Sequence, residues 1–129
     1  MTSRGARRIA HAGLPIVRSP SGLPSQHLVA RWCGSTSIFV GQQWLQPGER
    51  VLLHTHPVEE ALVFLAGTGE AILGDETVPI AAETTLYVPP ELPHGFRNVG
   101  STPLHLLVVF PGSDFAETRL REPIDQAGS

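Results

Sequence analysis

Two histidines and two glutamates stand close together in the segment GERVLLHTHPVEEALVFLAG, residues 48–67. His54 and His56 are two positions apart, so on a β-strand both imidazoles project from the same face and can share one metal ion. Glu59 and Glu60 are adjacent, so only one of them should face the same side. Alternation along a strand does not choose between these two carboxylates.

A third histidine, His94, follows the turn segment YVPPELP and opens the segment HGFRN. In a small barrel, a neighbouring strand can bring this imidazole to the same centre. Two or three neutral imidazoles with one carboxylate suit a single divalent transition metal ion (Fe, Mn, Ni, Co or Zn) and leave positions for exchangeable ligands. Such an ion acts as a Lewis acid, lowers the pKa of bound water, or binds a chelating substrate beside O2. The structural alternative for His94 is a loop histidine whose hydrogen bonds are made by the backbone. For Glu59 and Glu60, the alternative is a solvent-exposed start of a strand.

Short β-strands dominate the sequence from about Val29 to Phe110. The predicted strands are rich in β-branched and aromatic residues, and turn signals such as Pro47-Gly48 separate them. They span residues 37–45, 50–56, 61–67, 70–74, 84–88, 94–100 and 104–110. Short strands at this spacing, with no amphipathic helix between them, predict an all-β antiparallel sandwich or barrel.

The chain of 129 residues has the length of one domain. Residues 1–28 are rich in proline and predict an extended N-terminal arm, and residues 29–112 form the predicted barrel. Residues 113–129 form a C-terminal tail, in which DFAETRLREPID predicts a short helix that ends before Pro123.

Composition excludes several classes of function. The net charge of -3 and the absence of a run of like charges argue against nucleic acid as a partner. All basic residues are arginines, so a lysine Schiff base and a P-loop are ruled out. The single cysteine, Cys33, excludes an internal disulfide, and no apolar stretch reaches the length of a membrane span. We therefore expect a cytoplasmic protein with no membrane partner.

The spacing of these residues resembles that of the cupin superfamily. The family's first motif has glycine, five residues, His-x-His, three or four residues, glutamate, six residues and glycine. Its positions are filled here by Gly48, His54, His56, Glu60 and Gly67. The resemblance selects Glu60, rather than its neighbour, as the ligand.

The family's second motif is matched in part. Pro89, His94 and Asn98 stand at its proline, histidine and asparagine positions, whereas Glu83 and Glu91 replace its two glycines. These departures concern turn positions, so they bear on loop shape and on charge near the pocket mouth rather than on the ligands.

The resemblance implies a double-stranded β-helix, or jelly roll, with a metal ion inside one end of the barrel. The implied metal ligands are His54, His56, Glu60 and His94, and Glu60 can also act as a catalytic base. Members of the family are frequently dimers whose N-terminal strands pack across the interface, so we expect a homodimer.

The residues around the metal predict a mostly apolar pocket for a small-molecule ligand. Gln43 is predicted to face inward, because this leaves Trp44 free to bury its apolar area; the alternative is that Gln42 and Gln43 both lie at the surface. Phe96 shares a face with His94 and should line the pocket. Further candidates for substrate binding are Leu106 and Val108, if His105 points outward, and Tyr87, whose structural alternative is a packed tyrosine.

Three classes of function are consistent with these residues. The first is an Fe(II)- or Mn(II)-dependent dioxygenase acting on an oxygen-rich chelating substrate, which the apolar pocket favours. The second is a metal-assisted isomerase, cyclase or lyase of a sugar acid or polyketide-like carbonyl compound. The third is a non-catalytic binding or sensor module. His27, His105 and Cys33 receive no role from the sequence.

Overall fold

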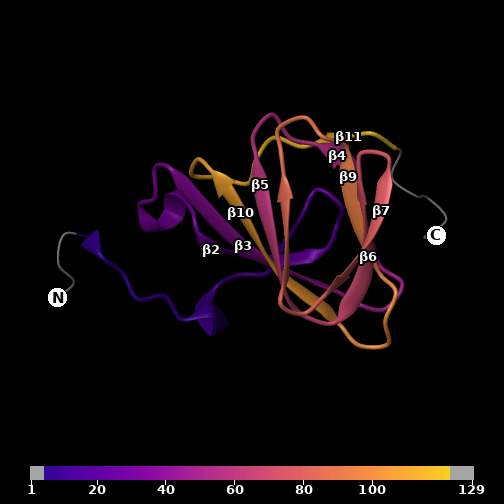
Figure 1. Ribbon diagram of the computed structural model, residues 1–129. Helices are drawn as coiled ribbons and strands as arrows, with labels where there is room; N and C mark the ends of the chain where they lie inside the picture. Colours follow the sequence, from indigo (N-terminus) through magenta and orange to yellow (C-terminus); the bar gives the residue numbers. More distant parts are fainter. Residues whose placement is uncertain (1–4, 123–129) are drawn as a thin grey trace.

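Strands arranged in two facing sheets make up most of the protein (Figure 1). The computed structural model describes residues 5–122. The strands are β1 (Val17–Arg18), β2 (Pro24–Val29), β3 (Ile38–Leu45), β4 (Arg50–Thr55), β5 (Glu60–Ala66), β6 (Thr68–Leu73), β7 (Glu76–Ala81), β8 (Thr84–Val88), β9 (His94–Asn98), β10 (Leu104–Pro111) and β11 (Arg119–Leu120). Two single-turn 3-10 helices, η2 (His11–Gly13) and η3 (Arg31–Cys33), flank the first two strands.

One sheet has the strand order β1-β2-β3-β10-β5-β8, and the other has the order β11-β4-β9-β6-β7. All neighbouring strands pair antiparallel. This arrangement is the double-stranded β-helix, or jelly roll, and the predicted all-β fold class is confirmed. Among residues 5–122, no helix has the length and apolar character needed to cross a membrane.

The core lies between the two sheets and follows from alternation along the strands. In β10, Leu104, Leu106, Val108 and Phe110 are buried, while the residues between them are only half-buried. The buried side chains of β10 pack with those of β3, β5 and β9, among them Phe39, Leu62, Phe64 and Phe96. Alternation of this kind is what one buried face of an antiparallel sheet requires.

The two terminal segments differ from their predicted forms. Within the predicted arm, β2 pairs with β3 along its length, so residues from Pro24 onward belong to the six-stranded sheet. The described part of the tail contains no helix; instead, β11 pairs with β4. Residues 123–129 of the predicted tail lie outside the described residues. The tail has helix-favouring composition, but its hydrogen bonds to an open strand edge override that weak preference.

Two glutamates occupy turns that favour glycine. Glu83 and Glu91 have φ angles of 65° and 64°, in the left-handed region. They are the residues that replace the two glycines of the cupin second motif, so the turns keep their backbone shape without glycine. By contrast, Gly67 has a φ of 90°, and a Cβ there would lie 2.6 Å from the carbonyl oxygen of Pro103.

Candidate metal site

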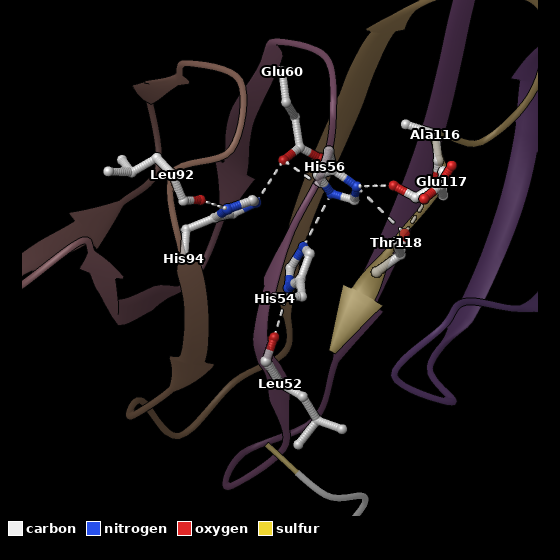
Figure 2. Close-up of polar contacts among 9 residues, drawn as sticks. All are labelled: Leu52, His54, His56, Glu60, Leu92, His94, Ala116, Glu117 and Thr118. Atoms are coloured by element: carbon white, nitrogen blue, oxygen red, sulfur yellow. Dashed lines mark hydrogen bonds and ion pairs between the residues drawn. The ribbon is translucent and has the colours of Figure 1, made fainter. Parts of the chain in front are cut away.

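Three histidines and one glutamate meet between the two sheets (Figure 2). His54 lies in β4, His56 directly follows this strand, and Glu60 and His94 begin β5 and β9. These four residues are between 1% and 6% exposed. One ligand atom from each of the four residues lies within 4.8 Å of the other three. The structure thus brings together all the residues that the cupin resemblance selects as metal ligands.

Strand register explains why these residues meet. In the five-stranded sheet, His54 pairs with His94 across β4 and β9, so both imidazoles share a face. Glu60 reaches them from the opposite sheet, where it pairs with Val88. A register shift in β4 precedes His54, and the strand passes so close to Gly95 that a Cβ there would lie 2.8 Å from the carbonyl oxygen of Val51. The glycine next to His94 therefore allows the two histidine-bearing strands to approach each other.

Each imidazole is fixed by a hydrogen bond from its outer nitrogen. The Nδ1 atoms of His54 and His94 donate to the carbonyl oxygens of Leu52 (2.6 Å) and Leu92 (2.8 Å). His56 Nδ1 donates to the carbonyl oxygen of Glu117 (2.9 Å). Because a carbonyl oxygen only accepts, Nδ1 carries a proton in each ring, and Nε2 is the atom of each ring that faces the centre of the cluster. Metal-binding histidines are oriented by the same kind of contact.

The inward nitrogens form an electron-rich cluster. His54 Nε2 and His56 Nε2 are 3.0 Å apart. Glu60 Oε1 lies 2.8 Å from His94 Nε2 and 3.6 Å from His56 Nε2. Unprotonated nitrogens at such distances repel one another unless a proton or a cation lies among them. The donor set therefore fits a divalent transition metal, for which neutral imidazole and carboxylate are common ligands.

Burial keeps two of the imidazoles neutral. The pKa of His54 is lowered to about 4, first by desolvation and then by the neighbouring His94. The pKa of His56 is also lowered to about 4, chiefly by desolvation. At neutral pH both rings are therefore uncharged, which is the state that binds a metal.

The C-terminal tail contributes residues that sequence reasoning does not identify. Besides the Glu117 carbonyl, Thr118 Oγ1 lies 3.4 Å from His56 Nδ1 (Figure 2). The ring of Phe115 lies 6.2 Å from that of His56 and 5.0 Å from that of Phe110, measured between centroids. The tail thus packs against the cluster and orients one of its imidazoles. No sequence signal marks this contact, since the acceptor is a backbone carbonyl that any residue type supplies.

A cavity of about 20 Å³ adjoins His54. It opens between the loop after β1 and the C-terminal tail, and its walls are Ser19, Pro20, Ser21, Gln43, Val51, His54, Phe115 and Thr118. Ser19, Pro20, Phe115 and Thr118 also line an outer cavity of about 420 Å³ together with Arg18, His27 and Ala116. We call this outer cavity the vestibule. It gives the cluster an approach from solvent between the two terminal segments.

The residues predicted to bind substrate lie in different places. Gln43 is buried and lines the cavity at His54. Phe96, Leu106 and Val108 are buried in the core, where Phe96 packs edge-to-face on Phe64 at 5.6 Å. None of these three lines the cavity at His54. Tyr87 is 62% exposed and donates a hydrogen bond to Glu59. It does not line the cavity at His54, but it lines a separate cavity of about 330 Å³ together with Glu60.

The facing sheets and the inward cluster of three histidines and a glutamate define a small jelly-roll protein with a candidate metal site. Residues 42–110 match the model of the cupin domain family, and the chain belongs to this family.

The proteins similar to the chain include two curated relatives and one solved structure. Protein SchB of Streptomyces halstedii is 34% identical over 108 residues, which cover 83% of this chain and 78% of SchB. Polyketide synthase CurC of Streptomyces cyaneus is 43% identical over 68 residues, which cover 52% of this chain and 44% of CurC. The polyketide cyclase RemF of Streptomyces resistomycificus superposes with a TM-score of 0.79 at 20% identity, over 92% of this chain and 87% of RemF. At that identity the superposition shows a shared fold.

Proposed function

We propose that this chain is a metal-dependent enzyme that closes a ring in a polyketide-type substrate bearing neighbouring carbonyl oxygens. The convergence of three imidazoles and one carboxylate beside a cavity carries the proposal. The similarity to CurC and RemF, whose names refer to polyketide synthesis and cyclisation, supports this choice of substrate.

The donor set suits one divalent transition metal ion, which we assign to His54, His56, Glu60 and His94. Such an ion, when bound, supplies Lewis-acid stabilisation of an enolate developing on the substrate. Glu60 is the one anionic member of the cluster. We assign its carboxylate to accept a proton from a carbon next to a substrate carbonyl.

Other side chains hold the substrate and exclude water. The Gln43 amide lies at the cavity beside His54, where it can donate a hydrogen bond to a substrate oxygen. Phe110 and Phe115 cover one side of His56 with apolar rings. We assign the predicted pocket residues Phe96, Leu106 and Val108 to the apolar wall behind the cluster.

A dioxygenase is the second candidate. The apolar side chains around the cluster favour it, because O2 partitions into apolar space and the same ligand set can hold Fe(II) or Mn(II). A bound ion would then supply a site at which a chelating substrate and O2 meet.

A turnover experiment separates these candidates. Protein loaded with Mn(II), Fe(II) or Zn(II) would be incubated with an aryl 1,3,5-triketone under argon and under air. Cyclisation predicts a product under argon with the mass of the substrate or of the substrate less one water. A dioxygenase instead requires air and consumes O2 with the substrate. Binding of the triketone without turnover in either atmosphere would contradict both enzymes and favour the sensor module.

We also propose that the chain forms a homodimer through the outer face of the six-stranded sheet. Leu107 pairs with Val63, and Val109 pairs with both Val40 and Ala61, so one outer patch is apolar across three strands. A solvated face of an antiparallel sheet would carry polar residues there. Val63→Glu should convert a dimer to a monomer in light scattering; a monomeric wild-type protein would contradict the proposal.

We infer a cytoplasmic location from the single cysteine, which fits a reducing compartment.

A further inference from the structure

His27 is a titratable group that the metal cluster does not use. It lies in β2 opposite Gly41, while Ser25 of the same strand lies opposite Gln43, so His27 and Gln43 project from the same inner face. Its ring packs edge-to-face on Phe39 at 4.9 Å and stacks with Phe115 at 6.4 Å. Within residues 5–122, neither nitrogen of this ring makes a hydrogen bond. Burial lowers the pKa of His27, and the charge of Asp114 opposes this effect, so the ring is neutral at pH 7 and can both donate and accept.

His27 lines two cavities. One is the vestibule, and the other is a groove of about 330 Å³, lined by Leu14, Pro15, Val17, His27 and Trp32. We call the second cavity the arm groove. Apart from His27, its walls are apolar residues, and Trp32 is 45% exposed. The Trp32 indole N–H donates to the His27 carbonyl oxygen at 3.0 Å, which holds the two residues together.

The arm groove, the vestibule and the cavity at His54 are neighbours, because they have lining residues in common. The vestibule shares four lining residues with the cavity at His54, and it shares His27 with the arm groove. A free imidazole thus stands between an apolar groove and a cluster of metal-ligating groups. A groove of this volume has the size of a small-molecule site, for which about 300–1,000 Å³ is typical.

We propose that the arm groove is a second subsite of the metal site. It takes the apolar rings of a ligand whose oxygen donors reach the cluster of His54, His56, Glu60 and His94. His27 forms a hydrogen bond with a carbonyl or phenol oxygen in the middle of that ligand. The inference rests on the proposed function for its chelating substrate. It adds the orientation of that substrate, with the oxygen donors at the metal cluster and the apolar rings in the arm groove.

Two ligands with the same donors test the subsite. Catechol and 1,2-dihydroxyanthraquinone share a pair of adjacent phenol oxygens, but only the second extends into further rings with carbonyl groups. Both would be titrated into zinc-loaded protein by calorimetry, after zinc content has been measured. We expect the anthraquinone to bind at least about tenfold more tightly, because its rings leave water for an apolar groove. In spectra of the same diamagnetic protein, the indole N–H signal of Trp32 should shift with the anthraquinone and not with catechol, while that of Trp44 stays in place.

Three variants assign the effect to the groove. Val17→Thr keeps the shape of the side chain. It should lower the affinity for the anthraquinone several-fold and leave the affinity for catechol unchanged. His27→Phe keeps the ring contacts but removes the hydrogen bond, and should have the same selective effect. Val99→Thr, at an exposed position remote from the groove, is the matched control and should change neither affinity.

Equal affinities for the two ligands, or equal weakening of both by Val17→Thr, would overturn the subsite and leave the proposed metal site standing. A protein that binds no zinc would instead contradict the proposed function itself. If a variant does not fold, the wild-type affinity ratio and the Trp32 signal decide the question. None of these measurements depends on turnover.

Discussion

The three imidazoles of the cluster behave alike because each is held by a carbonyl oxygen at Nδ1. This contact places a proton on Nδ1, so three Nε2 atoms point into one small space. Glu60 adds the only negative charge of the cluster, next to His94. A cation is therefore the ligand that the residues themselves favour.

Glu60 and Glu59 form a matched pair for testing the ligand set. Glu60→Gln removes the charge from a buried ligand and should lower metal affinity by at least about 100-fold, beyond the effect of residues that merely support ligands. Glu59→Gln alters a side chain that faces outward toward Tyr87 and should leave affinity unchanged. Competition with a chromophoric chelator would measure both affinities. Similar losses in the two variants would contradict the choice of Glu60.

The buried histidines make the metal-free protein sensitive to acid. The pKa values of His54 and His56 are about 4 in the folded protein, against 6.5 for an ordinary histidine. Below pH 6.5 the unfolded chain therefore binds protons that the folded chain does not. Stability should be complete above about pH 6.5 and should fall as the pH drops from there toward 4.

Urea unfolding in the presence of a chelator would measure this loss. Because carboxylates also titrate at the acid end, the comparison is with His54→Gln/His56→Gln, whose stability should fall less steeply over the same range. Parallel profiles for the two proteins would show that these histidines are not buried as neutral rings.

The C-terminal tail is the element that joins the cluster to the outside of the barrel. Two ion pairs hold it, Arg31–Asp114 and Arg50–Glu122, both at 2.6 Å. Between them, Phe115 and the Glu117 carbonyl contact His56. Because the tail orients His56, docking of the tail and binding of a metal at His56 are coupled. The coupling is reciprocal: a docked tail strengthens metal binding, and a bound metal stabilises the docked tail.

Removal of the tail after Gly112 should therefore weaken metal binding, by about 10–100-fold if the tail acts like other partners of metal ligands. By the same coupling, metal should slow hydrogen exchange at the Arg121 amide, which donates to the Leu53 carbonyl oxygen at 2.8 Å. Phe115→Ala keeps the chain length; it should also weaken metal binding and should reduce the slowing of hydrogen exchange by metal. Unchanged affinity in the truncated protein would contradict the coupling.

The turn at Glu83 stores backbone strain that the strands around it hold in place. A left-handed φ costs an ordinary residue about 1–2 kcal/mol, and glycine avoids this cost. Glycine also has more conformational freedom in the unfolded chain, which offsets part of the gain in stability. Glu83→Gly should therefore stabilise the protein by about 0.5–1 kcal/mol. Glu76→Gly, in β7, is the control and should destabilise it. Thermal unfolding of the two variants and the wild-type protein would measure these changes. A melting temperature of Glu83→Gly below that of the wild-type protein would contradict the presence of strain at Glu83.

At the scale of the whole molecule, periodicity in the sequence predicts the barrel because each strand buries one face. Periodicity does not predict β7, since Pro79 interrupts its pattern; the strand lies at a sheet edge, where a missing N–H is tolerated. Nor does it predict the strand in the tail, because pairing with β4 depends on an open edge that only the folded barrel provides. Local preference cannot anticipate such a contact.

The ligand set is predictable for a different reason. Register brings His54 and His94 opposite each other, and motif spacing selects Glu60. The vestibule is not predictable, since it forms between segments near the two ends of the chain, and neither Ser19 nor Phe115 carries a recognisable pattern. The contact of Tyr87 with Glu59 is likewise not predictable, because it depends on the pairing of β8 with β5.

We propose that this cupin holds one divalent transition metal ion in its cluster of three histidines and a glutamate. Elemental analysis of protein purified without metal-affinity columns and then dialysed tests it most directly. We predict about one equivalent of metal per chain in the wild-type protein and its loss in His54→Ala/His94→Ala. Metal content that is the same in the folded double variant would contradict the claim.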